Sequence, residues 1–144
     1  MRLASGLAAV LASMTLAAAP AGAPLEELPV QRLKAGECAL FLWTRDTPAR
    51  RVFMALQTPA VARIQVGGKT LELPRVSSEG QAVFGHYPVQ RYAGSGHELT
   101  VRIETDVRSG LSAGAVAPNA TIEHRAAGGW ETVIPAAGLI GCQG

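Results

Sequence analysis

The motif most suggestive of catalysis is a serine set between two glycines, Ser112 within residues 110–114 (GLSAG). It matches the G-x-S-x-G elbow of serine hydrolases, in which a strand, a sharp turn and a helix expose the serine oxygen beside an oxyanion hole. Pro118 follows too soon for such a helix to form. Glu123 and His124 come in an acceptable order for the partners of the serine, but no aspartate follows it. We therefore expect a glycine-rich turn here and no catalytic residue.

Three histidines are the candidates for metal ligands. His97 and His124 each have a glutamate neighbour, Glu98 and Glu123 respectively. Neighbouring residues on a strand point to opposite faces of the sheet, so each pair could supply only one ligand. Together with His86, the histidines also lack the short spacing of a metal-binding motif. We expect histidines at the surface or at a sheet edge, and neither a metal site nor a cofactor.

Cys38 and Cys142 are the two cysteines of the chain. They lack the C-x-x-C spacing of a redox pair, and two thiols without nearby histidines make a poor zinc site. In an oxidising compartment such a pair most simply forms one disulfide. We expect a structural disulfide that joins the beginning of the domain to its end.

A cluster of arginines is the strongest candidate for a binding site. Arg45, Arg50 and Arg51 fall within residues 44–51 (TRDTPARR), a polar loop in which only Asp46 offsets their charge. The arginine fork suits carboxylate and phosphate groups. The loop is therefore a candidate contact for an acidic protein, a lipid headgroup or a glycan, although a solvated loop tip is the commoner role of such a cluster.

The segments on either side of this loop are apolar on both faces. In a strand over residues 38–43 (CALFLW), leucines would face one side while Phe41 and Trp43 faced the other. Residues 52–56 (VFMAL) repeat the pattern. Because antiparallel sheets usually expose one face to water, two apolar faces indicate a second covering layer.

Two sources of that layer remain open. The first is the chain's own C-terminus, because a link from Cys142 to Cys38 would bring Leu139 and Ile140 to the first strand. The second is another protein, for which the aromatic pair of that strand would form a binding patch. We favour the first source, and the two are compatible.

The N-terminus has the three-part pattern of a secretory signal peptide. Arg2 supplies a positive charge, residues 3–18 are apolar, and small residues follow. The apolar core is shorter than the roughly 20 residues that cross a bilayer, and we expect cleavage after Ala21. The expected organisation is a signal peptide over residues 1–21, an entry segment over 22–35 and a single β domain over 36–144, without a transmembrane span.

Arginine far outnumbers lysine, and alanine and glycine are abundant, which is typical of bacterial genomes rich in G and C. For a bacterial protein, export predicts that the mature chain lies in the periplasm or the medium.

Alternation of apolar and polar residues predicts strands along the rest of the chain. Residues 61–73 contain two alternating runs joined by Gly67 and Gly68, the pattern of a tight hairpin. Residues 98–108 alternate like a half-buried strand, and residues 121–134 resemble another hairpin. We predict an all-β fold, a single antiparallel β-sandwich or small β-barrel of about seven to nine strands.

Composition narrows the function. The chain has 144 residues, enough for one domain, and its net charge of +2 is far below what nucleic-acid binding requires. We expect an exported, non-enzymatic β domain that binds an envelope protein or an anionic envelope component through the aromatic pair or the arginine loop. The alternatives are a small barrel that encloses an apolar ligand and an enzyme of unfamiliar type.

Overall fold

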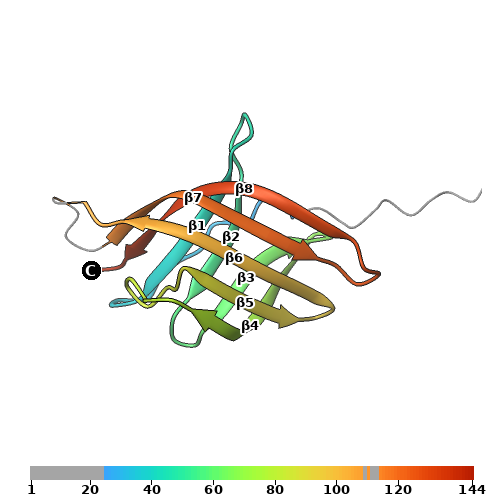
Figure 1. Cartoon of the computed structure of the whole chain (residues 1–144), viewed down its shortest axis with the longest axis horizontal. Helices are drawn as coiled ribbons and strands as arrows, with labels where there is room; N and C mark the ends of the chain where they lie inside the picture. The colour runs from blue at the N-terminus through green and yellow to red at the C-terminus, as the bar shows by residue number, and fades with distance from the viewer. Residues whose placement is uncertain (1–24, 109, 111–113) are drawn as a thin grey trace, which may run out of the picture.

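The computed structural model describes residues 25–108, 110 and 114–144, and all of its regular structure is β. Eight strands form a closed barrel in which each strand is antiparallel to its neighbours and the last pairs with the first (Figure 1). The prediction of a small antiparallel barrel is confirmed. Among the residues that the structure describes, no helix is long and apolar enough to cross a membrane. The strands are β1 (Cys38–Thr44), β2 (Arg51–Leu56), β3 (Val61–Val66), β4 (Lys69–Glu79), β5 (Val89–Gly94), β6 (His97–Asp106), β7 (Gly114–Arg125) and β8 (Glu131–Cys142).

The predicted local elements are present. Gly67 and Gly68 have φ angles of 57° and 74°, which residues with side chains rarely adopt, and they form the tight turn between β3 and β4. The alternating run over residues 98–108 forms most of β6, and the C-terminal hairpin is β7 paired with β8.

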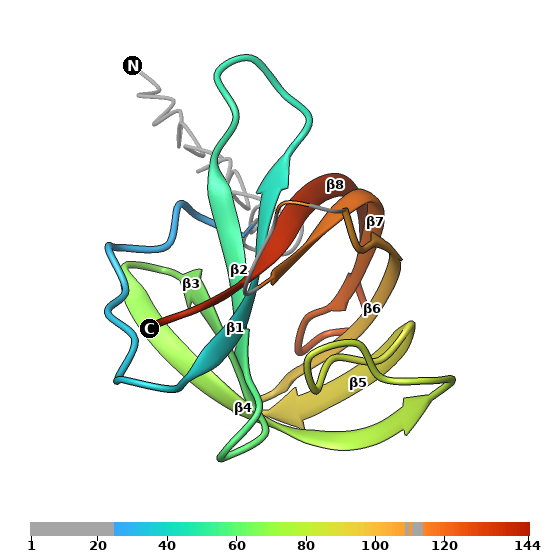
Figure 2. The same ribbon diagram turned by 90° about the vertical axis from the view of Figure 1, so that its left-hand side faces the viewer.

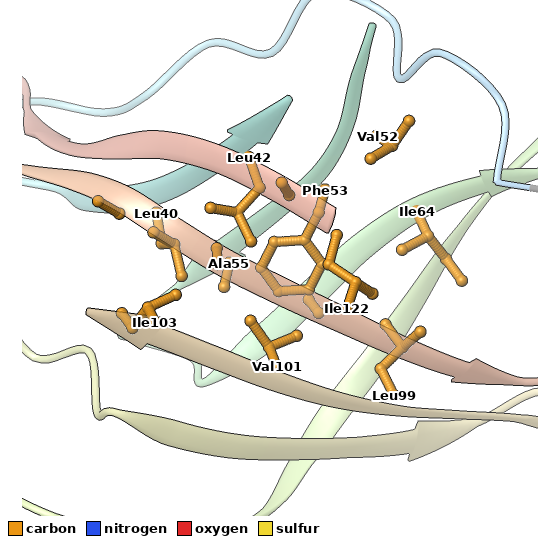
Figure 3. Close-up of a cluster of buried hydrophobic side chains, with 14 of the residues drawn as sticks. Leu40, Leu42, Val52, Phe53, Ala55, Ile64, Leu99, Val101, Ile103 and Ile122 are labelled. Atoms are coloured by element: carbon orange, nitrogen blue, oxygen red, sulfur yellow. The ribbon is translucent and has the colours of Figure 1, made fainter. Parts of the chain in front are cut away.

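Side chains from all eight strands fill the barrel interior (Figure 3). At its centre the rings of Phe53 and Tyr92 meet edge to face, with 5.8 Å between their centroids. Leu40 and Leu42 of β1 point into this core, as alternation predicts. Burying one such side chain contributes roughly 1.5–3 kcal/mol, so the interior is the main source of stability.

The two ends of the barrel differ. At one end, which we call the disulfide end, Cys38 lies opposite Cys142 and is bonded to it, so the expected disulfide closes the seam between β1 and β8. Figure 2 shows the barrel with the C-terminus on the side that faces the viewer. The hairpin end carries the turns at residues 67–68, 95–96 and 126–130 and the loop at residues 45–50.

The barrel wall has its shortest pairing between β2 and β3. Their register pairs only Met54 with Arg63 and Ala55 with Ala62, so the two strands separate toward the hairpin end. Residues 25–34, which we call the strap, run along this part of the wall.

The strap is bonded to both separated strands. The Glu26 amide donates to the carbonyl oxygen of Gln65 on β3 (2.9 Å). The Leu28 amide donates to the carbonyl oxygen of Arg51 on β2 (2.7 Å). Leu25 joins the interior core, whereas Leu28 is buried on the outside of the wall. The strap therefore seals the opening between β2 and β3.

The strap, and not the C-terminus, covers part of the outer face of the first hairpin, over Ala39, Met54 and Leu56, whereas Phe41 and Trp43 on the same face are half-buried. The expectation of a C-terminal cover is wrong, because a closed barrel places β8 beside β1 in the same wall. Ile140 of β8 consequently faces the interior, and Leu139 faces outward. The outer cluster, as we call it, is formed by Leu28 of the strap with Ala39, Met54 and Leu56 of the wall beneath it, and the partly buried Leu33, Phe41 and Val61 pack against these residues.

Candidate functional site

The outward face of β8 carries an uncharged row of side chains. Because Ile134 and Ile140 belong to the interior core, the alternate positions of this strand face outward. Leu139 is 42% exposed and Val133 is 57% exposed. By contrast, the exposed outward positions of β6 include Arg102 and other charged residues. The outward row of β8 consists of Val133, Pro135, Ala137 and Leu139.

The two aromatic residues predicted to bind a partner lie beside this row. In the register of β1 and β8, Phe41 is opposite Leu139 and Trp43 is opposite Ala137. Both aromatic side chains are half-buried, and their ring centroids are 6.2 Å apart. We call Phe41, Trp43 and the row on β8 the β1/β8 face. Sequence reasoning did not assign the β8 row to the binding surface, although residues 135–140 (PAAGLI) are apolar at both alternations.

Arg45 lies at the border of the β1/β8 face. From the end of β1 it reaches over to β7, where Nη2 donates to the carbonyl oxygen of Pro118 and to Oδ1 of Asn119 (3.2 Å). Asn119 in turn donates through Nδ2 to Oε2 of Glu104 (3.0 Å). Arg45 and Arg102 line a surface hollow of about 410 Å³ here. The apolar face is thus bordered by a fixed guanidinium group.

The other two loop arginines have different surroundings. The Arg50 guanidinium lies 3.7 Å from the Asp46 carboxylate, an exposed pair on the loop that projects from the barrel (Figure 1). Arg51 donates through Nη2 to the carbonyl oxygens of Leu28 (3.2 Å) and Pro29 (3.0 Å). The structure therefore does not gather the three arginines into one cluster, and Arg51 holds the strap in place.

Two of the three histidines form a pair inside the hairpin end. The Nδ1 atom of His97 and the Nε2 atom of His124 are 2.9 Å apart, and the rings are nearly parallel at 20°. Burial, and then the charge of His97, lowers the pKa of His124. The expectation that these histidines lie at the surface is wrong for His124, which is buried. Among the described residues, no three His, Cys, Asp or Glu side chains gather into a group able to hold a metal ion.

The third histidine is buried in the disulfide end. Burial, with a smaller effect of the charge of Arg75, lowers the pKa of His86 to about 4. A polar contact with the backbone of Cys38 acts in the opposite direction but falls outside hydrogen-bond geometry. The expected surface or edge position of His86 is therefore also wrong.

Further polar groups are buried in the barrel interior near Arg75. Tyr92 donates its hydroxyl to Oε1 of Gln90 (3.1 Å), and Arg75 donates through Nη1 to the same oxygen (3.3 Å). Burial raises the pKa of the Tyr92 hydroxyl. These groups position one another within the core.

The serine motif receives no support as a catalytic site. Ser112 lies outside the described residues. Glu123 and His124 are neighbours on β7 and face opposite sides of the wall. Glu123 points outward to Arg102, with 3.5 Å between the guanidinium and the carboxylate, while His124 points inward. The two side chains therefore do not serve one site.

Comparisons of this chain with protein-family models, with curated proteins and with solved structures find no match.

Proposed function

We propose that this protein is an exported, non-enzymatic β-barrel domain that binds a protein or another component of the bacterial cell envelope through the β1/β8 face. The main observation that supports this proposal is the uncharged outward row on β8, which lies beside Phe41 and Trp43.

The composition of this face supports binding. A contiguous apolar patch on a protein surface is a common mark of an interaction site, and aromatic residues and arginines dominate the affinity of many interfaces. Trp43 and Phe41 supply rigid aromatic surface, and Arg45 lies at the border. A closed barrel has no free strand edge, so a partner at this face must bind through side chains.

The arginines favour a partner that carries anionic groups. Arg45 is held by backbone and amide oxygens, so it needs little ordering when a partner arrives. Arg50 is exposed, and its pair with Asp46 is of the surface kind that contributes about 0–1 kcal/mol. A carboxylate or phosphate on the partner could therefore replace Asp46 at small cost.

Export is supported by the covalent chemistry of the chain. Structural disulfides persist in oxidising compartments, and Cys38 and Cys142 form one. Together with the signal-peptide pattern at residues 1–21, this favours the periplasm or the medium.

The filled interior favours a role for the outer surface over a role as ligand carrier. The Phe53 ring, with leucine and isoleucine side chains around it, lies in the space that an enclosed apolar ligand would need (Figure 3), and the Tyr92 ring meets it edge to face.

Site-specific photo-crosslinking in the native envelope tests the proposal. A photoreactive residue at position 139 should give a discrete crosslinked product, and Trp43→Asp should abolish that product. The matched control is position 76, where a valine that is 61% exposed, more than Leu139, projects from β4. Equal products from both positions, or none from position 139 in folded, exported protein, would contradict the proposal.

A further inference from the structure

We propose that the opening between β2 and β3 is a peptide-binding site, that the strap is its resident occupant, and that an extended segment of a partner protein can replace the strap there. This site adjoins the β1/β8 face at Phe41, which packs against the outer cluster, but the inference does not depend on that face being functional.

The backbone contacts of the strap are those of a bound extended peptide. The amides of Glu26 and Leu28 donate to one carbonyl on each side of the opening, at Gln65 and Arg51. The Arg51 guanidinium adds bonds to the carbonyl oxygens of Leu28 and Pro29. Backbone recognition of this kind supplies affinity for any extended segment and leaves selection to the side chains.

Three side chains of the strap supply the selection. Leu25 and Leu28 are each 1% exposed, one in the interior core and the other in the outer cluster. Between them, the Glu26 carboxylate accepts a hydrogen bond from the Gly68 amide (3.0 Å), whereas Glu27 is exposed. The preferred occupant is therefore an extended segment with two leucine-sized residues three apart and an acidic residue after the first.

The strap is separable from the barrel. It is not one of the eight strands, which complete their ring of pairing without it through the two residue pairs between β2 and β3. It leaves the opening through exposed residues, with Val30 83% exposed. Release of the strap would expose the wall residues of the outer cluster to water. Replacement of the strap by another apolar segment therefore costs less free energy than release without a replacement.

The test uses the folded protein with a protease site inserted at the exposed Val30. After cleavage, a fluorescent synthetic peptide of residues 22–30 should exchange with the cut strap, measured by fluorescence anisotropy. The peptide with Leu28→Asp should bind at least about tenfold more weakly, because burial of one leucine is lost. The peptide with Glu27→Ala is the matched control and should bind as the original does.

A locked protein provides the second control. Glu26 and Gln65 are opposed across the opening, so the double variant Glu26→Cys with Gln65→Cys is designed to hold the cut strap covalently and to exclude the peptide. In a parallel arm without cleavage, a peptide with a photoreactive group at position 27 should crosslink to β2 or β3 of the intact chain. Leu139→Asp should leave both results unchanged, which separates this site from the β1/β8 face.

Several outcomes would overturn the inference. Absence of exchange in the cut protein together with absence of crosslinking in the intact chain would make the strap a permanent part of the wall. Loss of the β circular-dichroism signal after cleavage would lead to the same conclusion. Strap exchange between two intact copies, seen as dimers by light scattering, would assign the site to self-association instead of a separate partner.

Discussion

The imidazole rings of His97 and His124 face each other inside the hairpin end, with Nδ1 of the first 2.9 Å from Nε2 of the second. One nitrogen must donate a proton while the other accepts it. The hydrogen bond therefore requires at least one neutral ring, because two imidazolium rings would have no acceptor between them and would repel each other.

Acidification should destabilise the barrel through this pair. Since the pKa of His124 is lowered by burial and by His97, the unfolded chain takes up its proton at a higher pH than the folded chain does. Stability should fall as the pH drops through the range near 6.5, where unfolded histidine titrates. Urea unfolding at a series of pH values should show a shallower fall for His124→Gln than for the original protein. An identical pH dependence in the two proteins would contradict this assignment.

His86 should extend the loss of stability to lower pH. Its pKa is about 4 in the folded state, against 6.5 in the unfolded state, so stability is lost between these values and is constant below them. The difference corresponds to about 3 kcal/mol when the loss is complete. His86→Phe should remove this part of the pH dependence, while its stability near pH 7 depends on how well the larger ring packs. Urea unfolding near pH 7 and near pH 4 measures both effects.

The strands could be predicted because their signal is local. Alternation in residues 61–73 and the two glycines at the turn determine a hairpin without reference to the rest of the chain. The two cysteines left one simple pairing, and that pairing is present. Closure of the barrel could not be predicted, because it depends on how β8 returns to β1, and sandwich and barrel share the same local pattern.

The aromatic pair and Arg45 were predicted from the sequence, whereas the histidine pair, the strap contacts and the β8 row depend on strand register and were missed. His97 and His124 meet only because β6 pairs with β7 so that Leu99 lies opposite His124. The strap does not show the alternation of apolar and polar residues that marks a strand, because it pairs along no single strand. Its two backbone hydrogen bonds go to two different strands. The outward row on β8 could not be identified from the sequence. Both faces of that strand are apolar, so the sequence did not distinguish the outward side from the inward side.

The disulfide should contribute several kcal/mol. It links residues 104 apart, and closing a loop of that length removes about 4–5 kcal/mol of chain entropy from the unfolded state. The Cys38→Ser, Cys142→Ser double variant should lose about that much free energy of unfolding in urea. A loss under about 1 kcal/mol would show that the paired ends of β1 and β8 hold the seam without covalent help.

Trp43 should matter little for stability and Phe53 should matter greatly. Trp43 is half-buried on the outside, so Trp43→Ala should cost about 1 kcal/mol. Phe53 is fully buried at the centre, and Phe53→Ala should cost about 3–5 kcal/mol. Thermal unfolding compares the two. A fall for Trp43→Ala as large as that for Phe53→Ala would place Trp43 among the stabilising core residues and remove it from the proposed binding face.

The seam between β1 and β8 should reject a side chain at Gly138. A Cβ atom there would overlap the carbonyl oxygen of Phe41 and crowd the Cα atom of Leu42, and both are backbone atoms of β1 that would have to shift. Gly138→Ala should therefore destabilise the barrel by about 2 kcal/mol or more, as overpacking of a rigid site does. Gly141→Ala on the same strand is the matched control, because its Cβ would meet only the movable end of Leu139. Since the β1/β8 face lies over this seam, Gly138→Ala should also reduce crosslinking from position 139. Equal unfolding midpoints for the two variants would show that β8 shifts along β1 without cost, contrary to the close contact described.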